Sequence, residues 1–235
     1  MSNNWFQFKQ FHIGQARSAL KVGTDGVLLG AWSMVQGTES ILDVGTGTGV
    51  IALMLAQRST AQIHALEMNG EACKDAADNF RNSPWEERLV LFHTDFNDFC
   101  KSDSNKYDLI VCNPPFFIRS LKSADAASSM ARHDGSLSFL QLITGAKNLM
   151  KDHGRLCVII PFEALDDFRE SARLTGFYLS RRTVVIPKTG KAPKRVLFEF
   201  SVSRCLPEMD ELVILDAEGR YSGQYKELTK EFYLN

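Results

Sequence analysis

Hydrophobic residues between positions 40 and 175 gather in short runs, and longer segments of helical character separate these runs. The short runs predict buried strands, which we place at 41–44, 62–66, 89–92, 107–112 and 155–160. The segments between them predict helices, which we place at 50–56, 71–81, 136–150 and 162–175. Because strands that alternate with helices pair in parallel, the pattern predicts an α/β fold with helices on both faces of the sheet.

The two ends of the chain follow different patterns. Aromatic residues partly alternate with polar ones before position 12, which predicts short strands. A helix is expected to begin at Thr24 or Asp25 and to run through Trp32, with one of the first two side chains capping its N-terminus. Two β-rich runs at 178–186 and 195–203 flank a loop with glycine and prolines. Together, these elements predict a mostly parallel seven-stranded sheet with an antiparallel C-terminal strand pair.

Composition and charge fit an ordinary globular protein. The 235 residues carry 27 basic and 28 acidic side chains and are 44% hydrophobic, which excludes a histone-like polycation and a disordered chain. No linker, repeat or low-complexity segment interrupts the pattern, so we expect a single domain over 1–235. Its core is expected at 40–203, with an N-terminal extension at 1–39 that lines the site and a C-terminal extension at 204–235.

The sequence shows no sign of a membrane, metal or disulfide. It contains no run of about 18 apolar residues, and its first residues lack the pattern of a signal peptide, so we expect a cytoplasmic protein. The five cysteines are scattered and lack Cys-x-x-Cys spacing, so we expect free thiols and no metal site.

A glycine-rich turn follows the first core strand and opens the next helix. It reads Asp43-Val44-Gly45-Thr46-Gly47-Thr48-Gly49, and glycines at this place let the backbone approach a ligand closely. The Gly-x-Gly-x-Gly spacing differs from the dinucleotide fingerprint, and no Lys-Ser or Lys-Thr follows to make a phosphate-binding loop. Taken alone, the turn is equally consistent with close packing of the helix on the strand.

Acidic residues stand at the ends of the first three core strands. Asp43, Glu67 and Asp95 are expected to face one crevice, because the carboxyl ends of parallel strands meet at one edge of a sheet. Such a row of acceptors suits a ligand that carries an ammonium group, a ribose diol and an exocyclic amine. Each acid alone would fit a helix cap or a surface position, and only the three together favour a binding site.

These residues resemble the cofactor site of class I S-adenosylmethionine-dependent methyltransferases. The resemblance implies a Rossmann-like fold and S-adenosyl-L-methionine as cofactor. In that family the glycine turn lies under the methionine moiety, the acid at Glu67's position holds the ribose, the next residue packs on adenine, and the acid at Asp95's position takes the adenine amine. The cofactor-binding residues that the resemblance implies are Thr24, Asp25, Asp43, Gly45, Gly47, Gly49, Glu67, Met68, Asp95, Phe96 and Asn113.

The tetrapeptide Asn113-Pro114-Pro115-Phe116 follows the fourth core strand and is the most specific signal in the chain. Two consecutive prolines end the strand and fix the backbone, which leaves carbonyl groups free to face a ligand. The Asn113 amide oxygen and the Pro114 carbonyl can accept both hydrogens of a substrate amine, while Phe116 stacks on a planar substrate. These four are the candidate catalytic residues.

The tetrapeptide also resembles the signature of amino-methyltransferases that act on planar conjugated amines. Adenine N6, guanine N2 and a protein glutamine amide are all substrates of such enzymes, and the signature does not separate them. A proline turn that only closes the strand is the simpler alternative. The neighbouring Cys112 ends an apolar strand and is expected to be a packing residue, because direct methyl transfer needs no covalent intermediate.

Basic residues concentrate in one part of a chain whose net charge is −1. Residues 171–198 contain no acid, and their basic side chains predict an RNA-binding surface. Lysines that protect an exposed strand edge would give the same pattern. The RNA-binding candidates are Arg181, Arg182, Lys188, Lys191, Lys194 and Arg195.

The whole chain resembles the bacterial tRNA1(Val) (adenine(37)-N6)-methyltransferases, most clearly in segments 21–32 and 221–229. The resemblance implies methyl transfer to adenine N6 in tRNA, with the anticodon loop as the binding partner, no DNA, no membrane, and a monomer or weak homodimer. The alternatives are a guanine-N2 RNA methyltransferase, a protein glutamine N5-methyltransferase, and an RNA-binding module with a methyltransferase-like fold. The glutamine enzyme is disfavoured because its additional N-terminal helical domain has no room before residue 41.

Overall fold

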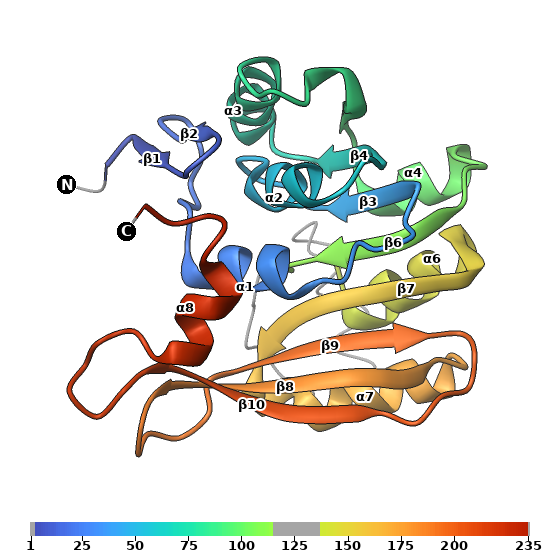
Figure 1. Cartoon of the computed structure of the whole chain (residues 1–235). Helices are drawn as coiled ribbons and strands as arrows, with labels where there is room; N and C mark the ends of the chain where they lie inside the picture. Colours follow the sequence, from blue (N-terminus) through green and yellow to red (C-terminus); the bar gives the residue numbers. More distant parts are fainter. Residues whose placement is uncertain (1–2, 115–136, 235) are drawn as a thin grey trace.

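The fold is built on one large sheet with helices on both of its faces (Figure 1). A computed structural model describes residues 3–114 and 137–234. Within these residues the sheet has eight strands in the order β10-β8-β9-β7-β6-β3-β4-β5, and β1 pairs with β2 in a separate antiparallel hairpin. All neighbouring strands are parallel except β9, which runs antiparallel to both β7 and β8.

The helices and strands that the hydrophobic pattern predicts all occur, and in the predicted order, together with three elements that it does not predict. The strands are β1 (Trp5–Gln7), β2 (His12–Gly14), β3 (Ser40–Val44), β4 (Gln62–Glu67), β5 (Leu89–His93), β6 (Tyr107–Cys112), β7 (Met150–Pro161), β8 (Tyr178–Lys188), β9 (Arg195–Ser201) and β10 (Glu208–Leu215). The helices are α1 (Thr24–Trp32), α2 (Val50–Arg58), α3 (Gly70–Arg81), α4 (Phe96–Ser102), α6 (Phe139–Leu149), α7 (Leu165–Leu174) and α8 (Gly223–Thr229). None of the helices in the described part of the chain is long and apolar enough to cross a membrane.

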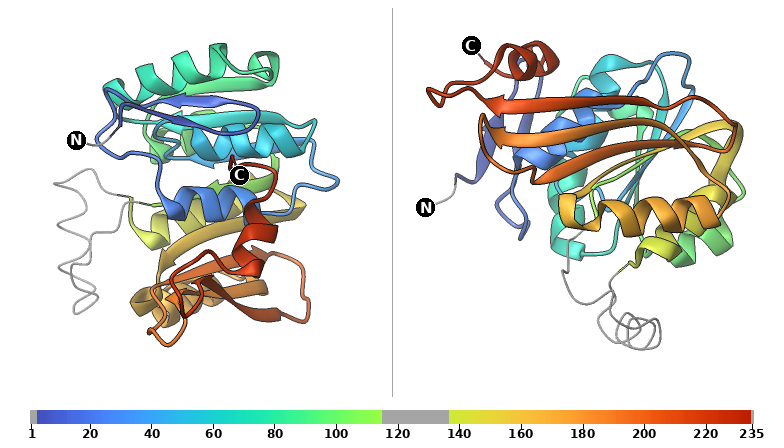
Figure 2. Two further views of the ribbon diagram at one scale, coloured as in Figure 1. Left: turned by 60° about the vertical axis from the view of Figure 1, so that its left-hand side comes forward. Right: turned by 90° about the horizontal axis from the view of Figure 1, so that it is seen from below.

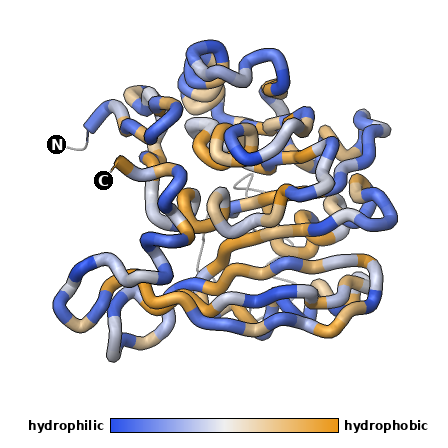
Figure 3. Tube along the Cα trace, in the orientation of Figure 1, coloured by the Kyte–Doolittle hydropathy of each residue, from blue (hydrophilic) through white to orange (hydrophobic). Residues whose placement is uncertain are grey.

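Two apolar cores lie on opposite faces of the sheet (Figure 2). One contains side chains of α1, α2, α3 and α8, and the other contains side chains of α4, α6 and α7. Neighbouring residues of β3 serve both, because Ile41 packs into the first core and Leu42 into the second. A strand buried on both faces reads as a continuous apolar run, which explains why the sequence pattern locates the central strands so well. Figure 3 shows apolar residues following these strands and polar residues in the outer loops.

The sheet has one strand more than predicted, although the α/β class is confirmed. The additional strand, β10, lies in the segment predicted as a C-terminal extension and pairs in parallel with β8. It forms the edge of the sheet, and the first four of its residues are exposed. Edge strands need no apolar run, because one side and one face meet water, so the hydrophobic pattern does not identify this strand.

Three further local features differ from the prediction. The helices α4 and α8 were not predicted. Each has only seven residues, with too few apolar positions to show a helical period. Helix α1 begins at Thr24, as expected, but its N-cap is Gly23 and no side chain caps it. Asp25, which was expected to do so, instead forms an ion pair with Arg195.

Candidate functional site

The glycine turn and Asn113 directly follow two neighbouring strands of the sheet, which end in register with each other. In the sheet, Val44 at the end of β3 pairs with Cys112 at the end of β6. On its other side Val44 pairs with Leu66, the residue before Glu67. The chain order reverses between β3 and β6, and in open α/β sheets ligands bind in the crevice beyond the carboxyl ends at such a point. The sheet therefore brings the turn, Glu67 and Asn113 to one edge, as the sequence predicts.

The glycine turn is open on the side where a side chain would stand. Gly45 and Gly47 adopt left-handed φ angles of 72° and 58°, which side chains disfavour. A Cβ atom on either residue would have no described atom within 4 Å. Gly49 also has a left-handed φ, of 84°, and a Cβ there would in addition lie 2.5 Å from the ring of Phe80. The first two glycines thus leave space for a ligand, and the third allows α2 to pack closely on α3.

Glu67 is buried at the end of β4 and holds the turn in place. Its Oε2 accepts a hydrogen bond from the Gly47 amide at 2.8 Å, and its Oε1 accepts one from the Asn69 amide at 2.7 Å. Each carboxylate oxygen can accept more than one hydrogen bond, so acceptor capacity remains for a ligand diol. Glu67 therefore connects the glycine turn to the loop between β4 and α3.

Asp43 lies fully buried beneath the same turn. Its Oδ2 accepts hydrogen bonds from the Thr46 hydroxyl at 2.6 Å and from the Ala52 amide at 3.2 Å. Burial raises the pKa of Asp43 to about 7, against the opposing effect of these two hydrogen bonds. Its Oδ1 has no hydrogen-bond partner among the described residues. Asp43 thus stabilises the start of α2 and retains one unused acceptor.

Asn113 also carries an unused acceptor. Its Oδ1 is buried and has no hydrogen-bond partner within residues 3–114 and 137–234. A buried amide oxygen without a partner is costly unless a ligand or water satisfies it. Pro114 beside it is buried, whereas Pro115 and Phe116 lie outside the described residues. Burial raises the pKa of the Cys112 thiol well above its usual range, which agrees with a packing role for this residue.

The three residues predicted at the cofactor's adenine end differ in exposure and in their hydrogen bonds. Asp95 caps α4, where its Oδ1 accepts a hydrogen bond from the Asn97 amide at 2.7 Å. Met68 follows Glu67 and is 55% exposed, so its side chain is accessible to a ligand. Phe96 is buried in the core, where its ring packs against Gly145 of α6. Its side chain is a core residue, and we leave it out of the proposed cofactor site.

The predicted pair Thr24-Asp25 also lies near the carboxyl edge of the sheet, where Asp25 forms an ion pair with Arg195. Arg195 Nε donates to Asp25 Oδ2 at 2.8 Å, and both side chains are about one quarter to one third exposed. Arg195 pairs with Pro161 at the carboxyl end of β7. The start of α1 therefore lies beside the start of β9.

The six RNA-binding candidates fall into two groups. Lys188, Lys191, Lys194 and Arg195 belong to the turn between β8 and β9, which we name the basic hairpin (residues 188–195). It lies at the carboxyl edge of the sheet, because the Phe162 amide directly after β7 donates to the Lys194 carbonyl. Lys191 and Lys194 are exposed, as an RNA contact requires.

Arg181 and Arg182 lie in the middle of β8 instead, away from the basic hairpin. The Arg181 guanidinium stacks 3.6 Å from the ring centroid of Trp32 and donates to the Trp32 carbonyl. Its side chain is only 17% exposed and also contacts the buried Glu199. Arg182 points to the opposite face of the strand, and its Nε is buried. Arg181 is thus a structural residue, whereas the RNA-binding role of Arg182 stays a prediction; neither belongs to the basic hairpin.

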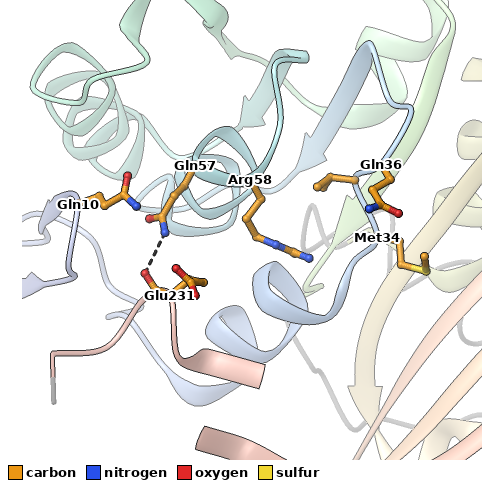
Figure 4. Close-up of a pocket in the computed structure, with 7 residues that line it drawn as sticks. Gln10, Met34, Gln36, Gln57, Arg58 and Glu231 are labelled. Atoms are coloured by element: carbon orange, nitrogen blue, oxygen red, sulfur yellow. Dashed lines mark hydrogen bonds between the residues drawn. The ribbon is translucent and has the colours of Figure 1, made fainter. Parts of the chain in front are cut away.

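A cavity of about 420 Å³ lies away from this site, at the other end of α2 (Figure 4). Gln57 and Arg58 line it from α2, and Glu231 lines it from the C-terminal segment. Helix α2 begins at the glycine turn and rises about 12 Å to Arg58. The cavity therefore lies at the amino edge of the sheet and contains none of the predicted site residues.

Comparisons with known proteins agree with this geometry. The family description "Methyltransferase small domain" matches residues 18–164. A tRNA1(Val) (adenine(37)-N6)-methyltransferase of Bacteroides fragilis (strain YCH46) is 46% identical over 235 residues, which cover 100% of this chain and 99% of the relative. One of Pasteurella multocida (strain Pm70) is 42% identical over 98% of this chain and 97% of the relative.

The fold itself is shared with more distant enzymes. A crystal structure described as a predicted O-methyltransferase from Agrobacterium tumefaciens superposes with a TM-score of 0.69 at 16% identity, covering 88% of this chain and 96% of the other. Together with the full-length relatives, this shows that the chain belongs to the tRNA1(Val) (adenine(37)-N6)-methyltransferase family of class I methyltransferases.

Proposed function

We propose that this protein transfers a methyl group from S-adenosyl-L-methionine to the exocyclic N6 amine of adenine in tRNA, at adenine 37 in the anticodon loop of tRNA1(Val). The observation that carries the proposal is the pairing of Val44 with Cys112, which brings the open glycine turn next to Asn113. Relatives that match over nearly their whole length, and that are named tRNA1(Val) (adenine(37)-N6)-methyltransferase, support the choice of adenine N6 over guanine N2 and protein glutamine. The unused acceptor of Asn113 favours an enzyme over a module that only binds RNA.

The residues at the glycine turn fit the cofactor. Gly45 and Gly47 provide a surface without side chains, and Glu67 provides a buried carboxylate beside it. We assign the methionine end of the cofactor to this turn and to Asp43, the ribose to Glu67, and the adenine to Met68 and Asp95. When bound, S-adenosyl-L-methionine supplies an electrophilic methyl group on a sulfonium. These residues hold and orient it and need no metal for that task.

The chemistry assigned to the chain itself is the orientation of the substrate amine. The Asn113 Oδ1 and the Pro114 carbonyl accept its two hydrogens, which draws the nitrogen lone pair out of conjugation and directs it toward the cofactor. Phe116 is expected to stack on the base. An adenine in a loop is turned outward more easily than one in a duplex, because fewer stacking and pairing contacts are lost.

The modified nucleoside tests this function directly. Incubation of the purified protein with S-adenosyl-L-methionine and undermodified total tRNA is expected to yield N6-methyladenosine, which mass spectrometry of digested tRNA detects. Mapping of the modified fragment is expected to place it beside the valine anticodon. Formation of N2-methylguanosine, or of no methylated nucleoside, would contradict the proposal.

The basic hairpin is proposed to hold the tRNA backbone next to the reactive base. Substitution of Lys191→Glu together with Lys194→Glu is expected to weaken tRNA binding about tenfold and to lower the slope of log affinity against log salt by about 1 to 2, because two phosphate contacts are lost. Filter binding at several salt concentrations measures both quantities.

A matched control changes the charge by the same amount elsewhere. Lys101→Glu with Lys106→Glu places the new charges near the amino end of β6, on the opposite edge of the sheet. This variant is expected to retain most of the affinity and the wild-type salt slope. If both double variants bind tRNA equally well, the basic hairpin is not part of the RNA surface.

A further inference from the structure

Two buried polar side chains of α3 attach the segment that joins β2 to α1. This segment, residues 14–22, has no regular structure after Gly14 and contains exposed residues such as Leu20, which is 74% exposed. Asp75 and Asn79 lie one helical turn apart and are only 4% and 3% exposed. Polar side chains buried on the inner face of a helix must have partners, and both residues find theirs in this segment.

Asn79 links the segment to the glycine turn. Its Oδ1 accepts from the Gly14 amide at 2.7 Å, and its Nδ2 donates to the Gly14 carbonyl at 2.8 Å. The same Nδ2 donates its second hydrogen to the Thr48 carbonyl, also at 2.8 Å. One amide group thus joins α3, the beginning of the segment and the glycine turn.

Asp75 fixes the middle of the segment. Its Oδ2 accepts hydrogen bonds from the Arg17 amide at 3.0 Å, the Ser18 amide at 2.8 Å and the Ser18 hydroxyl at 2.8 Å. Its Oδ1 accepts from Arg17 Nη1 at 3.2 Å. A buried carboxylate that is satisfied by two successive backbone amides holds the chain there in one conformation.

The strand and the helix that flank the segment both contact the glycine turn or the start of α2. Gly14 shares Asn79 with Thr48, and Gly26, in the first turn of α1, packs against Val50 at the start of α2. Between these two elements the segment is held to α3, which begins three residues after Glu67. The segment is therefore held next to the glycine turn.

We propose that Asp75 and Asn79 are positioning residues that hold segment 14–22 as one wall of the S-adenosyl-L-methionine site. This inference rests on the proposed placement of the cofactor at the glycine turn. A wall that is ordered before binding spares the cofactor the entropic cost of ordering it, so the two residues raise affinity without touching the cofactor. Neither residue takes part in the transfer itself.

The test compares Asp75→Ala and Asn79→Ala with wild type in two measurements. In the cofactor-free protein, hydrogen exchange of segment 14–22 is expected to become at least about tenfold faster, because its anchors are lost. By calorimetry, the Kd for S-adenosyl-L-methionine is expected to rise roughly tenfold, or about 1.4 kcal/mol. The kcat at saturating cofactor is expected to stay within about twofold of wild type, since the reacting groups are unchanged.

Two further variants separate positioning from general damage. Asp78→Ala removes the exposed neighbour that pairs with Arg17 Nη1 but no backbone anchor, and it is expected to behave as wild type. Asp75→Asn keeps an acceptor for the backbone amides and is expected to restore part of the affinity. Faster exchange with an unchanged Kd, or unchanged exchange in both alanine variants, would overturn the inference. If wild type itself binds no S-adenosyl-L-methionine, the proposed function fails instead.

Discussion

Asn113→Ala is expected to lower kcat for tRNA methylation by about 10²- to 10³-fold, which is typical of removing one preorganised polar contact to a reacting group. The reason is that the buried Oδ1 of Asn113 is an acceptor without a partner among the described residues, at the edge where β6 meets the glycine turn. Without it, one hydrogen of the substrate amine has no acceptor and the lone pair is no longer directed. Binding of S-adenosyl-L-methionine is expected to remain within a few-fold of wild type.

Single-turnover methylation and calorimetry together check this prediction. Asn113→Asp retains acceptor oxygens at the same place and is expected to keep more activity than the alanine variant. Asn105→Ala is the control, because Asn105 precedes β6 at the opposite edge of the sheet. Full turnover in Asn113→Ala, or a parallel loss of cofactor binding, would remove the role assigned to this residue.

Glu67→Gln is expected to weaken S-adenosyl-L-methionine binding by about 10- to 100-fold, corresponding to about 1.5–3 kcal/mol for hydrogen bonds to a charged group. The two oxygens of Glu67 accept from the Gly47 and Asn69 amides. A glutamine of the same shape must turn its NH₂ group toward one of these donors, which breaks that bond and displaces the turn. The substitution also replaces one carboxylate oxygen, an acceptor for the ribose diol, with an NH₂ group that can only donate.

Calorimetric titration of S-adenosyl-L-methionine into the variant measures this effect. Glu71→Gln is a matched control, because Glu71 lies in the first turn of α3 and its exposed carboxylate pairs, among the residues that the structure describes, only with Lys74. The control is expected to bind as wild type does, since an exposed ion pair contributes little. Equal affinity of the Glu67 and Glu71 variants would place the ribose elsewhere.

The predicted site residues show which contacts a local pattern can reveal. Glu67 and Asn113 were predicted from their places at strand ends, and the parallel register alone brings such positions together. Phe96 was implied by the family resemblance and Arg181 was predicted from an acid-free basic stretch, but the Phe96 side chain points into the core and the Arg181 side chain packs against Trp32. The hydrophobic periodicity of a strand or helix predicts the position of a residue along that element, but it does not determine what packs against the residue's side chain.

Asp75 and Asn79 were not predicted to matter, although a signal is present. They share the face of α3 that carries Ala72, Ala76 and Phe80, and polar residues on an apolar face require partners. Apart from Thr48, their partners lie 57 to 65 residues earlier in the chain, in a segment without a hydrophobic pattern. No local rule connects two such stretches.

The sequence by itself determined the buried core strands, the longer helices between them and their order, because burial on both faces produces apolar runs and a parallel sheet then aligns the strand ends at one edge. The tertiary structure alone decided the long-range partners. Asp25 meets Arg195 across 170 residues, and β10 joins the sheet as an exposed edge strand. Such contacts depend on three-dimensional packing of distant segments, where a charge or amide takes whichever partner the fold brings within hydrogen-bond distance.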